Sequence, residues 1–250
     1  MSQVLVAARS TPSFWSVSLN FRAPASLSRA DRDALFVIAN DAAATGRAWF
    51  DDQLDHYDEI LVLEAEGRPI GLVGLATFHV GGARVLYTGA VTLDPAWRGL
   101  GLIQWAGLRC AARLIGLDAP WWLMDTDSWR AYARTAGALG QVWPARGPAP
   151  GFYLAVCAAR YGDDFDPARG VCRPLAHRRL RPAVTAIPAT ALANPHVRDF
   201  VARNPGHADG DAVPMLARLD AGNLAHLALA CARAALGWPK GAGLAKSVSP

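Results

Sequence analysis

The segment Val91–Gly101, with the sequence VTLDPAWRGLG, decides the fold of this 250-residue chain, because it joins a predicted strand to a predicted helix. The strand ends at Leu93, and the helix is expected to begin near Gly101. Glycines let the backbone turn tightly and approach a ligand closely. The free N–H groups of the helix's first turn, at the positive end of its dipole, form an anion site that suits a pyrophosphate. Alternatively, the glycines only connect the two elements.

Two common phosphate-binding motifs do not fit this loop. No Gly-Lys-Ser/Thr follows it, so it is not a Walker loop. The pattern GxGxxG is also absent, and the preceding strand belongs to an antiparallel meander, which excludes a good dinucleotide-binding fingerprint.

Outward from this loop, the patterns predict alternating strands and helices. Upstream strands are expected over Phe14–Phe21, Glu59–Ala65, Arg68–Val80 and Arg84–Leu93. A Ser28 cap starts a helix to about Ala44, and a looser helix runs from Trp49 to Leu54. Downstream, we expect a strand at Trp121–Met124, a helix after Ser128, strands at Trp143 and Phe152–Ala158, and a helix over Leu224–Ala235.

The loop in this context resembles motif A of the GNAT superfamily of N-acyltransferases. In that motif a strand leads to an acidic or proline-containing turn, an aromatic residue and then Arg/Gln-x-x-Gly-x-Gly/Ala. Arg98 and Gly101 match the first two fixed positions, while Ile103 stands where Gly or Ala is expected. The family's order of elements fits the chain from about Phe14 to Ala158.

This resemblance implies an α/β fold with a mixed, largely antiparallel, splayed sheet flanked by helices and followed by an α-rich C-terminal extension. We expect a GNAT-like acyl-CoA-binding domain over residues 1–160, an extension packed on it over 161–240, and a flexible tail over 241–250.

The resemblance also implies where acyl-CoA binds. Leu93 would pair with the pantetheine arm in strand fashion. The backbone N–H groups that would bind the pyrophosphate belong to Arg98, Gly99, Leu100, Gly101, Leu102 and Ile103. The co-substrate would be acetyl-CoA or a longer acyl-CoA, with no metal.

For the chemistry, the resemblance places the thioester where the strands ending at Leu93 and Met124 splay apart. Asp125 and Asp127 follow the second strand and are candidates to anchor or deprotonate an amine, or else helix N-terminal charges before Ser128. Tyr132 is the candidate general acid toward the thiolate, or else a packed aromatic residue. Tyr87 and His79 either face the acceptor cleft or are ordinary strand residues.

Composition narrows the class of protein further. With 52% hydrophobic residues and a net charge of only +4, the chain can bury a large core and is not disordered overall. The small basic excess does not indicate nucleic-acid binding. Much of it lies at Arg173, Arg178, Arg179 and Arg181 around His177, which form a solvated loop or contact an anionic small molecule or acidic partner.

The sequence does not indicate a metal site, a disulfide, a membrane span or a secreted protein. The four cysteines form no CxxC pair, so neither zinc nor disulfides are expected. The apolar segment Pro69–Ala83 is shorter than the about 20 residues that a membrane-spanning helix needs. No signal peptide is evident, and the expected location is the cytoplasm.

The sequence therefore predicts an acyltransferase that moves an acyl group from a CoA thioester to an amine of a small molecule or peptide. One alternative keeps the fold and takes the acyl group from an acidic acyl carrier protein, contacted by the basic run. The other is a GNAT-like module that binds acyl-CoA or a partner without turnover.

Overall fold

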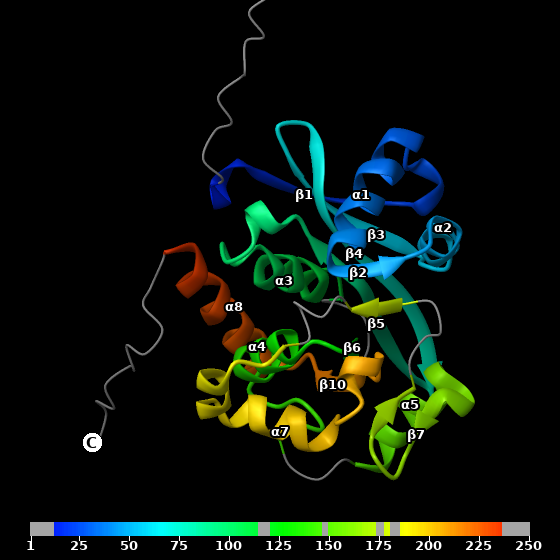
Figure 1. The fold of residues 1–250 in the computed structure, drawn as a ribbon, viewed down its shortest axis with the longest axis vertical. Helices are drawn as coiled ribbons and strands as arrows, with labels where there is room; N and C mark the ends of the chain where they lie inside the picture. The colour runs from blue at the N-terminus through cyan, green and yellow to red at the C-terminus, as the bar shows by residue number, and fades with distance from the viewer. Residues whose placement is uncertain (1–12, 115–120, 147–149, 174–177, 181–185, 237–250) are drawn as a thin grey trace, which may run out of the picture.

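A computed structural model describes residues 13–114, 121–146, 150–173, 178–180 and 186–236 of the chain (Figure 1). Its centre is a six-stranded sheet in the order β1-β3-β4-β5-β6-β10. Every neighbouring pair is antiparallel except β5 and β6, which are parallel. The strands are β1 (Val17–Arg22), β3 (Glu59–Ala65), β4 (Arg68–Val80), β5 (Ala83–Leu93), β6 (Trp121–Thr126) and β10 (Val213–Arg218). The mixed, largely antiparallel sheet predicted from the sequence is confirmed.

Two-residue turns build the meander from β3 to β5. Glu66 and Gly67 both have positive φ, at 52° and 71°, and so do Gly81 and Gly82, at 54° and 78°. Positive φ at both central positions is the hairpin geometry that matches the twist of the flanking strands.

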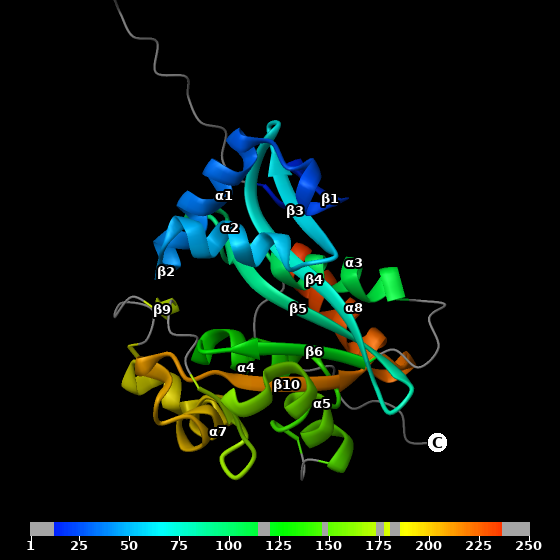
Figure 2. The ribbon, with the colours of Figure 1, turned by 90° about the vertical axis from the view of Figure 1, so that its right-hand side faces the viewer.

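The sheet opens between β5 and β6. The two strands pair only from Val85 to Thr88, opposite Trp121–Met124. Just beyond, Gly89 still lies opposite Gly74 of β4, but Thr92 lies opposite Leu72, so β5 has one extra residue and bulges. A bulge bends its strand, and Figure 2 shows β5 running away from β6. Ala90, with φ of +49°, lies within this bulge.

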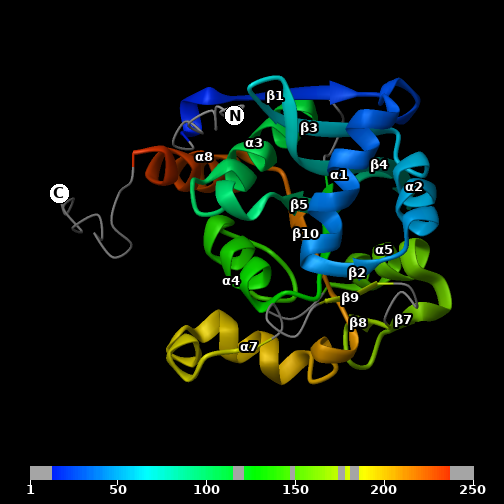
Figure 3. The ribbon, with the colours of Figure 1, turned by 45° about the horizontal axis from the view of Figure 1, so that its top comes forward.

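Helices cover both faces of the sheet (Figures 1 and 3). One face packs against α1 (Arg29–Ala42), α2 (Arg47–Asp55) and α5 (Gly151–Tyr161). The other face packs against α3 (Leu102–Leu114), α4 (Trp129–Ala138), α7 (Pro195–Arg203) and α8 (Ala221–Ala235). Because each strand sends alternate side chains to opposite faces, the two apolar cores are separate clusters.

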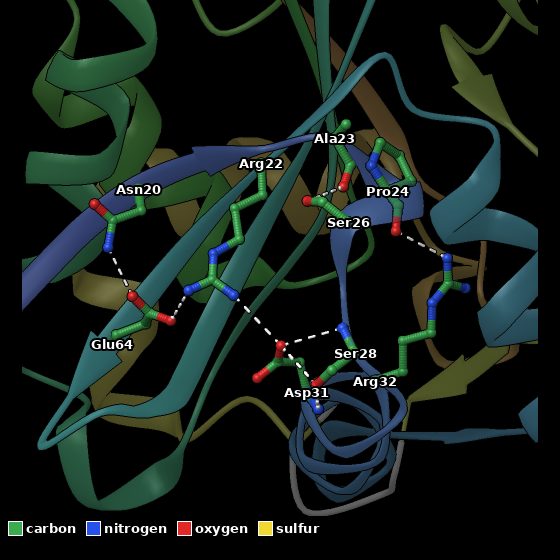
Figure 4. A network of polar contacts seen from close by, with 9 residues as sticks. All are labelled: Asn20, Arg22, Ala23, Pro24, Ser26, Ser28, Asp31, Arg32 and Glu64. Atoms are coloured by element: carbon green, nitrogen blue, oxygen red, sulfur yellow. Dashed lines mark hydrogen bonds and ion pairs between the residues drawn. The ribbon is translucent and has the colours of Figure 1, made fainter.

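The start of α1 shows the predicted Ser28 cap, in a capping-box arrangement with Asp31 (Figure 4). Asp31 N–H donates to Ser28 Oγ at 3.1 Å, and Ser28 N–H donates to Asp31 Oδ2 at 3.2 Å. Arg22 of β1 donates both to Asp31 Oδ2, at 3.3 Å, and to Glu64 Oε1 of β3, at 2.5 Å. These contacts attach the first helix to the edge of the sheet.

Two sequence expectations for the fold are wrong. Phe152–Ala158 forms part of helix α5, not a strand, and its buried residues Tyr153, Val156 and Cys157 have helical spacing. The strand beside β6 is instead β10, and Trp143 contributes only an isolated bridge to Leu216. The six-stranded sheet therefore includes one strand from beyond residue 160.

Part of the predicted extension lies beyond what the structure describes. The tail over 241–250 is outside the described residues, as are His177 and Arg181 of the basic run. Arg178 lies in β9 (Arg178–Leu180), which pairs with β2 (Ala43–Thr45) as a small separate sheet. Within the described ranges, every helix is too short or too polar to cross a bilayer.

Candidate active site

The predicted pyrophosphate loop lies between β5 and α3. Asp94 Oδ1 accepts the Ala96 N–H at 2.8 Å and starts a short 3-10 turn, Pro95–Trp97. Gly99 and Gly101 then adopt φ of +90° and +79°, and α3 begins at Leu102. The N–H groups of a helix's first turn have no partner inside that helix, so this geometry fits an anion.

Arg98 fixes the loop to its surroundings. Its Nε donates to the Leu93 carbonyl at 2.9 Å, and its Nη2 donates to Asp41 Oδ2 of α1 at 3.1 Å. The side chain thus ties the end of β5 to a helix on the opposite face. It also occupies the carbonyl of Leu93, one of the backbone groups expected to pair with a pantetheine arm.

Helix α8 packs directly against the loop. A Cβ added to Gly101 would lie 2.2 Å from Ala234 Cβ, and one added to Gly107 would lie 3.8 Å from Leu227 Cδ1. The two helices are therefore antiparallel, with the end of α8 beside the start of α3 (Figure 3). A Cβ at Gly99 would meet nothing within 4 Å. The open side of the loop is at Gly99, while Gly101 has a packing role.

A cavity of about 470 Å³ lies on the α1, α2 and α5 face of the sheet, within the usual size range of ligand sites. It begins where β5 and β6 separate. The residues that give it its chemical character are Tyr57, Tyr87, Asp125, Asp127, Arg160 and Tyr161.

Asp125 is the centre of the polar network in this cavity. The Tyr87 hydroxyl donates to Asp125 Oδ2 at 2.7 Å, and the Tyr161 hydroxyl donates to the same oxygen at 2.9 Å. Asp125 is the first residue of β6 beyond its pairing with β5, and on its other side it lies opposite Pro214 of β10. Its position in a strand does not fit the alternative of a charge in the first turn of α4.

Two glycines make room for the tyrosines. A Cβ at Gly74 would lie 2.4 Å from the Tyr57 ring, and a Cβ at Gly89 would lie 2.6 Å from both the Tyr57 and Tyr87 hydroxyl oxygens. The two hydroxyls therefore meet over Gly89, at the point where the sheet opens.

Burial controls protonation in the cavity. It raises the pKa of Tyr87 and Tyr161 well above that of free tyrosine, and the nearby Asp125 charge raises both further. Burial also raises the pKa of the Cys172 thiol in the cavity wall. These groups stay protonated at neutral pH, so the tyrosines donate hydrogen bonds and Cys172 is a poor nucleophile.

The structure brings together only part of the predicted catalytic set. Asp127 lines the same cavity as Asp125 and is only 7% exposed. Tyr132 is fully buried on the opposite face, where its hydroxyl bonds Asp199 and its ring packs 5.4 Å from Phe200. Tyr132 is therefore remote from the cavity, and its role as general acid stays an untested prediction.

The sequence does not decide whether Tyr87 and His79 face the acceptor cleft, and the structure shows a difference between them. Tyr87 faces the cavity, whereas His79 is exposed near the end of β4 and does not line it. Sequence reasoning missed Arg160 and Tyr161, because the expected strand and the family's order of elements both end at Ala158. The signal was present: Gly162, with φ of +55°, ends a helix whose apolar residues recur at helical spacing.

Among the described residues, no group of three His, Cys, Asp or Glu side chains could hold a metal ion. The segment around His207 forms a short 3-10 turn, His207–Asp209.

The strand order and the opening between β5 and β6 give this chain a GNAT-like fold. No family model matches it, and no curated protein matches its sequence.

Solved structures with partial likeness include three N-acyltransferase-related proteins. An acyl-CoA N-acyltransferase from Pseudomonas aeruginosa is 20% identical, with a TM-score of 0.36, over 45% of this chain and 80% of its own. A GNAT family N-acetyltransferase from Escherichia coli in complex with CoA is 16% identical, with a TM-score of 0.36, over 47% of this chain and 66% of its own. A conserved protein of unknown function from Enterococcus faecalis is 17% identical, with a TM-score of 0.38, over 50% of this chain. The chain spans only 34% of that protein's length.

Proposed function

We propose that this protein transfers an acyl group, acetyl or longer, from a CoA thioester to the primary amine of a small molecule or peptide. The observation that carries the proposal is the opening of the sheet beyond Thr88 and Met124. The glycine loop follows the wide end of this opening, and the cavity around Asp125 lies at its narrow end. A thioester extending along β5 would therefore meet an amine held in the cavity.

The residues along the opening fit such a donor. Within the described residues, Gly89–Leu93 has a strand partner only on its β4 side, so its other edge can pair with the amides of a pantetheine arm. The first-turn N–H groups of α3, from Leu102 onward, would hold the pyrophosphate. Leu93 would contribute through its remaining backbone groups, because its carbonyl already accepts a bond from Arg98.

The reaction needs no covalent enzyme intermediate. The amine nitrogen uses its lone pair to form a C–N bond with the thioester carbonyl carbon, and the C–S bond breaks. The amine loses one proton and the CoA thiolate gains one, so the products are an amide and free CoA. A thiol with a pKa near 8.5 is a good leaving group, and it can take the proton that the amine gives up.

In this mechanism the two aspartates act on the amine. The carboxylate of Asp125 would bind the ammonium group and accept one of its protons, which frees the nitrogen lone pair for attack and is then released to solvent. It would also stabilise the positive charge that returns to nitrogen as the C–N bond forms, before the second proton passes to the thiolate. Tyr87 and Tyr161 hold Asp125 through its Oδ2 oxygen and act as positioning residues. Asp127 would contribute a second negative charge to the same cavity. Tyr132 would serve the packing of α4 against α7.

Two measurements test the proposal. Calorimetric titration should show binding of CoA and acetyl-CoA. Acetyl-CoA incubated with the protein and a series of amines should release free CoA, whose thiol is measured by absorbance with Ellman's reagent. The protein's own thiols should react little with the reagent, because Cys110, Cys157, Cys172 and Cys231 are buried. An Asp125→Asn variant should retain CoA binding and lose turnover.

The outcomes separate the alternatives. Binding of CoA without turnover on any amine would favour the non-catalytic module. Turnover with acyl-pantetheine on a carrier protein but not with acyl-CoA would favour the carrier alternative. Failure to bind CoA, acyl-CoA or acyl-pantetheine would refute acyl transfer altogether. A cytoplasmic location stays a prediction from the sequence.

A further inference from the structure

The cavity around Asp125 carries opposite charges on different walls. Asp125 and Asp127 come from the β6 side, while Arg160 comes from the end of α5 and Arg173 from the segment after β8 (Val171–Cys172). An acceptor recognised only by its amine would need the acidic wall alone, so the arginines require their own explanation.

Arg160 is held in place by aromatic rings. Its guanidinium carbon lies 4.2 Å from the centre of the Tyr87 ring and 5.6 Å from that of Tyr161. These are the two tyrosines that donate to Asp125, so one network orients both the carboxylate and the cation. Part of the Arg160 side chain stays exposed, which leaves it accessible from the cavity.

The arginines do not serve the lining carboxylates as ion-pair partners. Within the part of the chain that the structure describes, every ion pair within 4.0 Å involves other cations, and neither Arg160 nor Arg173 has a carboxylate at that distance. Asp164 also lines the cavity, but its contact with Arg173 is between backbone atoms: the Arg173 N–H donates to the Asp164 carbonyl at 2.8 Å.

We propose that the acceptor is a compact amine that also carries one anionic group, held by Arg160 while Asp125 binds its ammonium. A guanidinium fork fits both carboxylate and phosphate, so the class comprises amino acids and aminoalkyl phosphates. With about 30 Å³ for each water-sized group, a cavity of about 470 Å³ accommodates roughly 15 non-hydrogen atoms. The inference rests on the proposed function for the chemistry, but the binding of such a compound does not depend on it.

Matched ligands test the anionic group directly, by calorimetry without any acyl donor. Phenylalanine and phenethylamine differ by one carboxylate, and phosphoethanolamine and ethanolamine differ by one phosphate. We expect the anionic member of at least one pair to bind tenfold or more tightly than its partner. The pair that shows the preference identifies the anion.

Three variants assign the preference to Arg160. Arg160→Gln should abolish the preference for the anionic ligand, so that both members of each pair bind with equal affinity. Arg160→Lys should restore part of it, because the charge returns without the fork. Arg134→Gln, on the exposed surface of α4, is the matched control and should bind as the unmodified protein does. Circular dichroism checks that each variant is folded.

Equal affinity within both pairs, or no binding of any of the four compounds, would overturn the inference, and so would an unchanged preference in a folded Arg160→Gln protein. Amino-acid binding without CoA binding would refute acyl transfer and leave this inference standing. Acylation of phenethylamine and ethanolamine as fast as of their anionic partners would support acyl transfer and refute this inference.

Discussion

Replacing Gly101 by alanine tests whether this glycine serves packing as well as ligand approach. The sequence suggests that a glycine here lets a pyrophosphate come close. In the structure, the missing side chain also makes room for α8, because an added Cβ would lie 2.2 Å from Ala234 Cβ. Gly101→Ala should therefore destabilise the protein even in the absence of CoA.

Two costs contribute to the change in the free energy of unfolding. An L-residue at φ of +79° is strained by roughly 1–2 kcal/mol. Overpacking against Ala234 adds about 1–3 kcal/mol. Reduced freedom of the unfolded chain offsets up to about 1 kcal/mol. The net loss is about 1–5 kcal/mol, which for a chain of this size lowers Tm by about 2–20 °C.

A double-mutant cycle with Ala234→Gly separates the two costs. Removing the methyl group relieves the clash but not the backbone strain, so we expect a coupling free energy of about 1–3 kcal/mol between the two sites. The control is Gly99→Ala, where φ is +90° but a Cβ meets nothing within 4 Å; it should be strained yet uncoupled to Ala234. Urea unfolding followed by tryptophan fluorescence measures all of these values. Additive effects of Gly101→Ala and Ala234→Gly within about 0.5 kcal/mol would refute the proposed contact between α8 and the loop.

Three further predictions concern the ligand loop, the catalytic residues and pH. Gln104→Glu places a negative charge in the first turn of α3, so it should raise Tm slightly by interaction with the helix dipole. The same charge should weaken CoA binding about tenfold, measured by calorimetry, and leave the affinity for pantetheine unchanged. Gln104→Ala is the control. Asp125→Asn should lower kcat/KM about 10²-fold or more. Tyr132→Phe should keep turnover within about twofold while losing about 1–3 kcal/mol of stability with its hydrogen bond to Asp199. The reverse pattern would support the prediction that Tyr132 is the general acid. Burial raises the pKa of four tyrosines, which therefore keep their protons in the folded state above pH 10 while the unfolded chain releases them. The free energy of unfolding should then fall with rising pH by up to about 1.4 kcal/mol per pH unit for each of them. Absorbance at 295 nm and circular dichroism should change together, and tyrosinate formation in a still-folded protein would contradict this. The four are Tyr87, Tyr132, Tyr153 and Tyr161.

Sequence reasoning succeeds here where short-range contacts determine structure. The hairpin turns at Glu66–Gly67 and Gly81–Gly82 need residues that tolerate positive φ, and glycine supplies that locally. The Ser28 cap and the start of α3 near Gly101 are likewise set by neighbours a few residues away. Such signals can be found without knowing the tertiary structure.

It fails where partners come from far along the chain. The pairing of β10 with β6 joins residues about ninety positions apart, and nothing local marks Val213–Arg218 as the neighbour of Trp121–Thr126. The fully buried positions of α3 include two small residues, Ala106 and Cys110. The glycines and alanines of α3 and α8 bring the helices close together, and a scale of hydrophobicity underrates such small residues.

At the cavity, some lining residues were predicted from the sequence and others were not. Asp125 and Asp127 were identified because they follow a buried strand at the expected splay, and both line the cavity. Arg160 and Tyr161 were not, because their approach to Asp125 depends on where α5 packs. A family pattern that stops near residue 158 gives no information about the residues that complete the site from beyond it.

The C-terminal third of the chain is therefore part of the candidate active site and not an appendage to it. Strand β10 places Pro214 opposite Asp125 and so supports the strand that carries the central carboxylate. Gly210 and Ala212, just before β10, form part of the cavity wall. Helix α8 packs on Gly101 at the opposite end of the opening. Because the extension contacts both the loop proposed for the donor and the cavity proposed for the acceptor, the two ends of the site are built by the same segment, and neither would keep this shape without it.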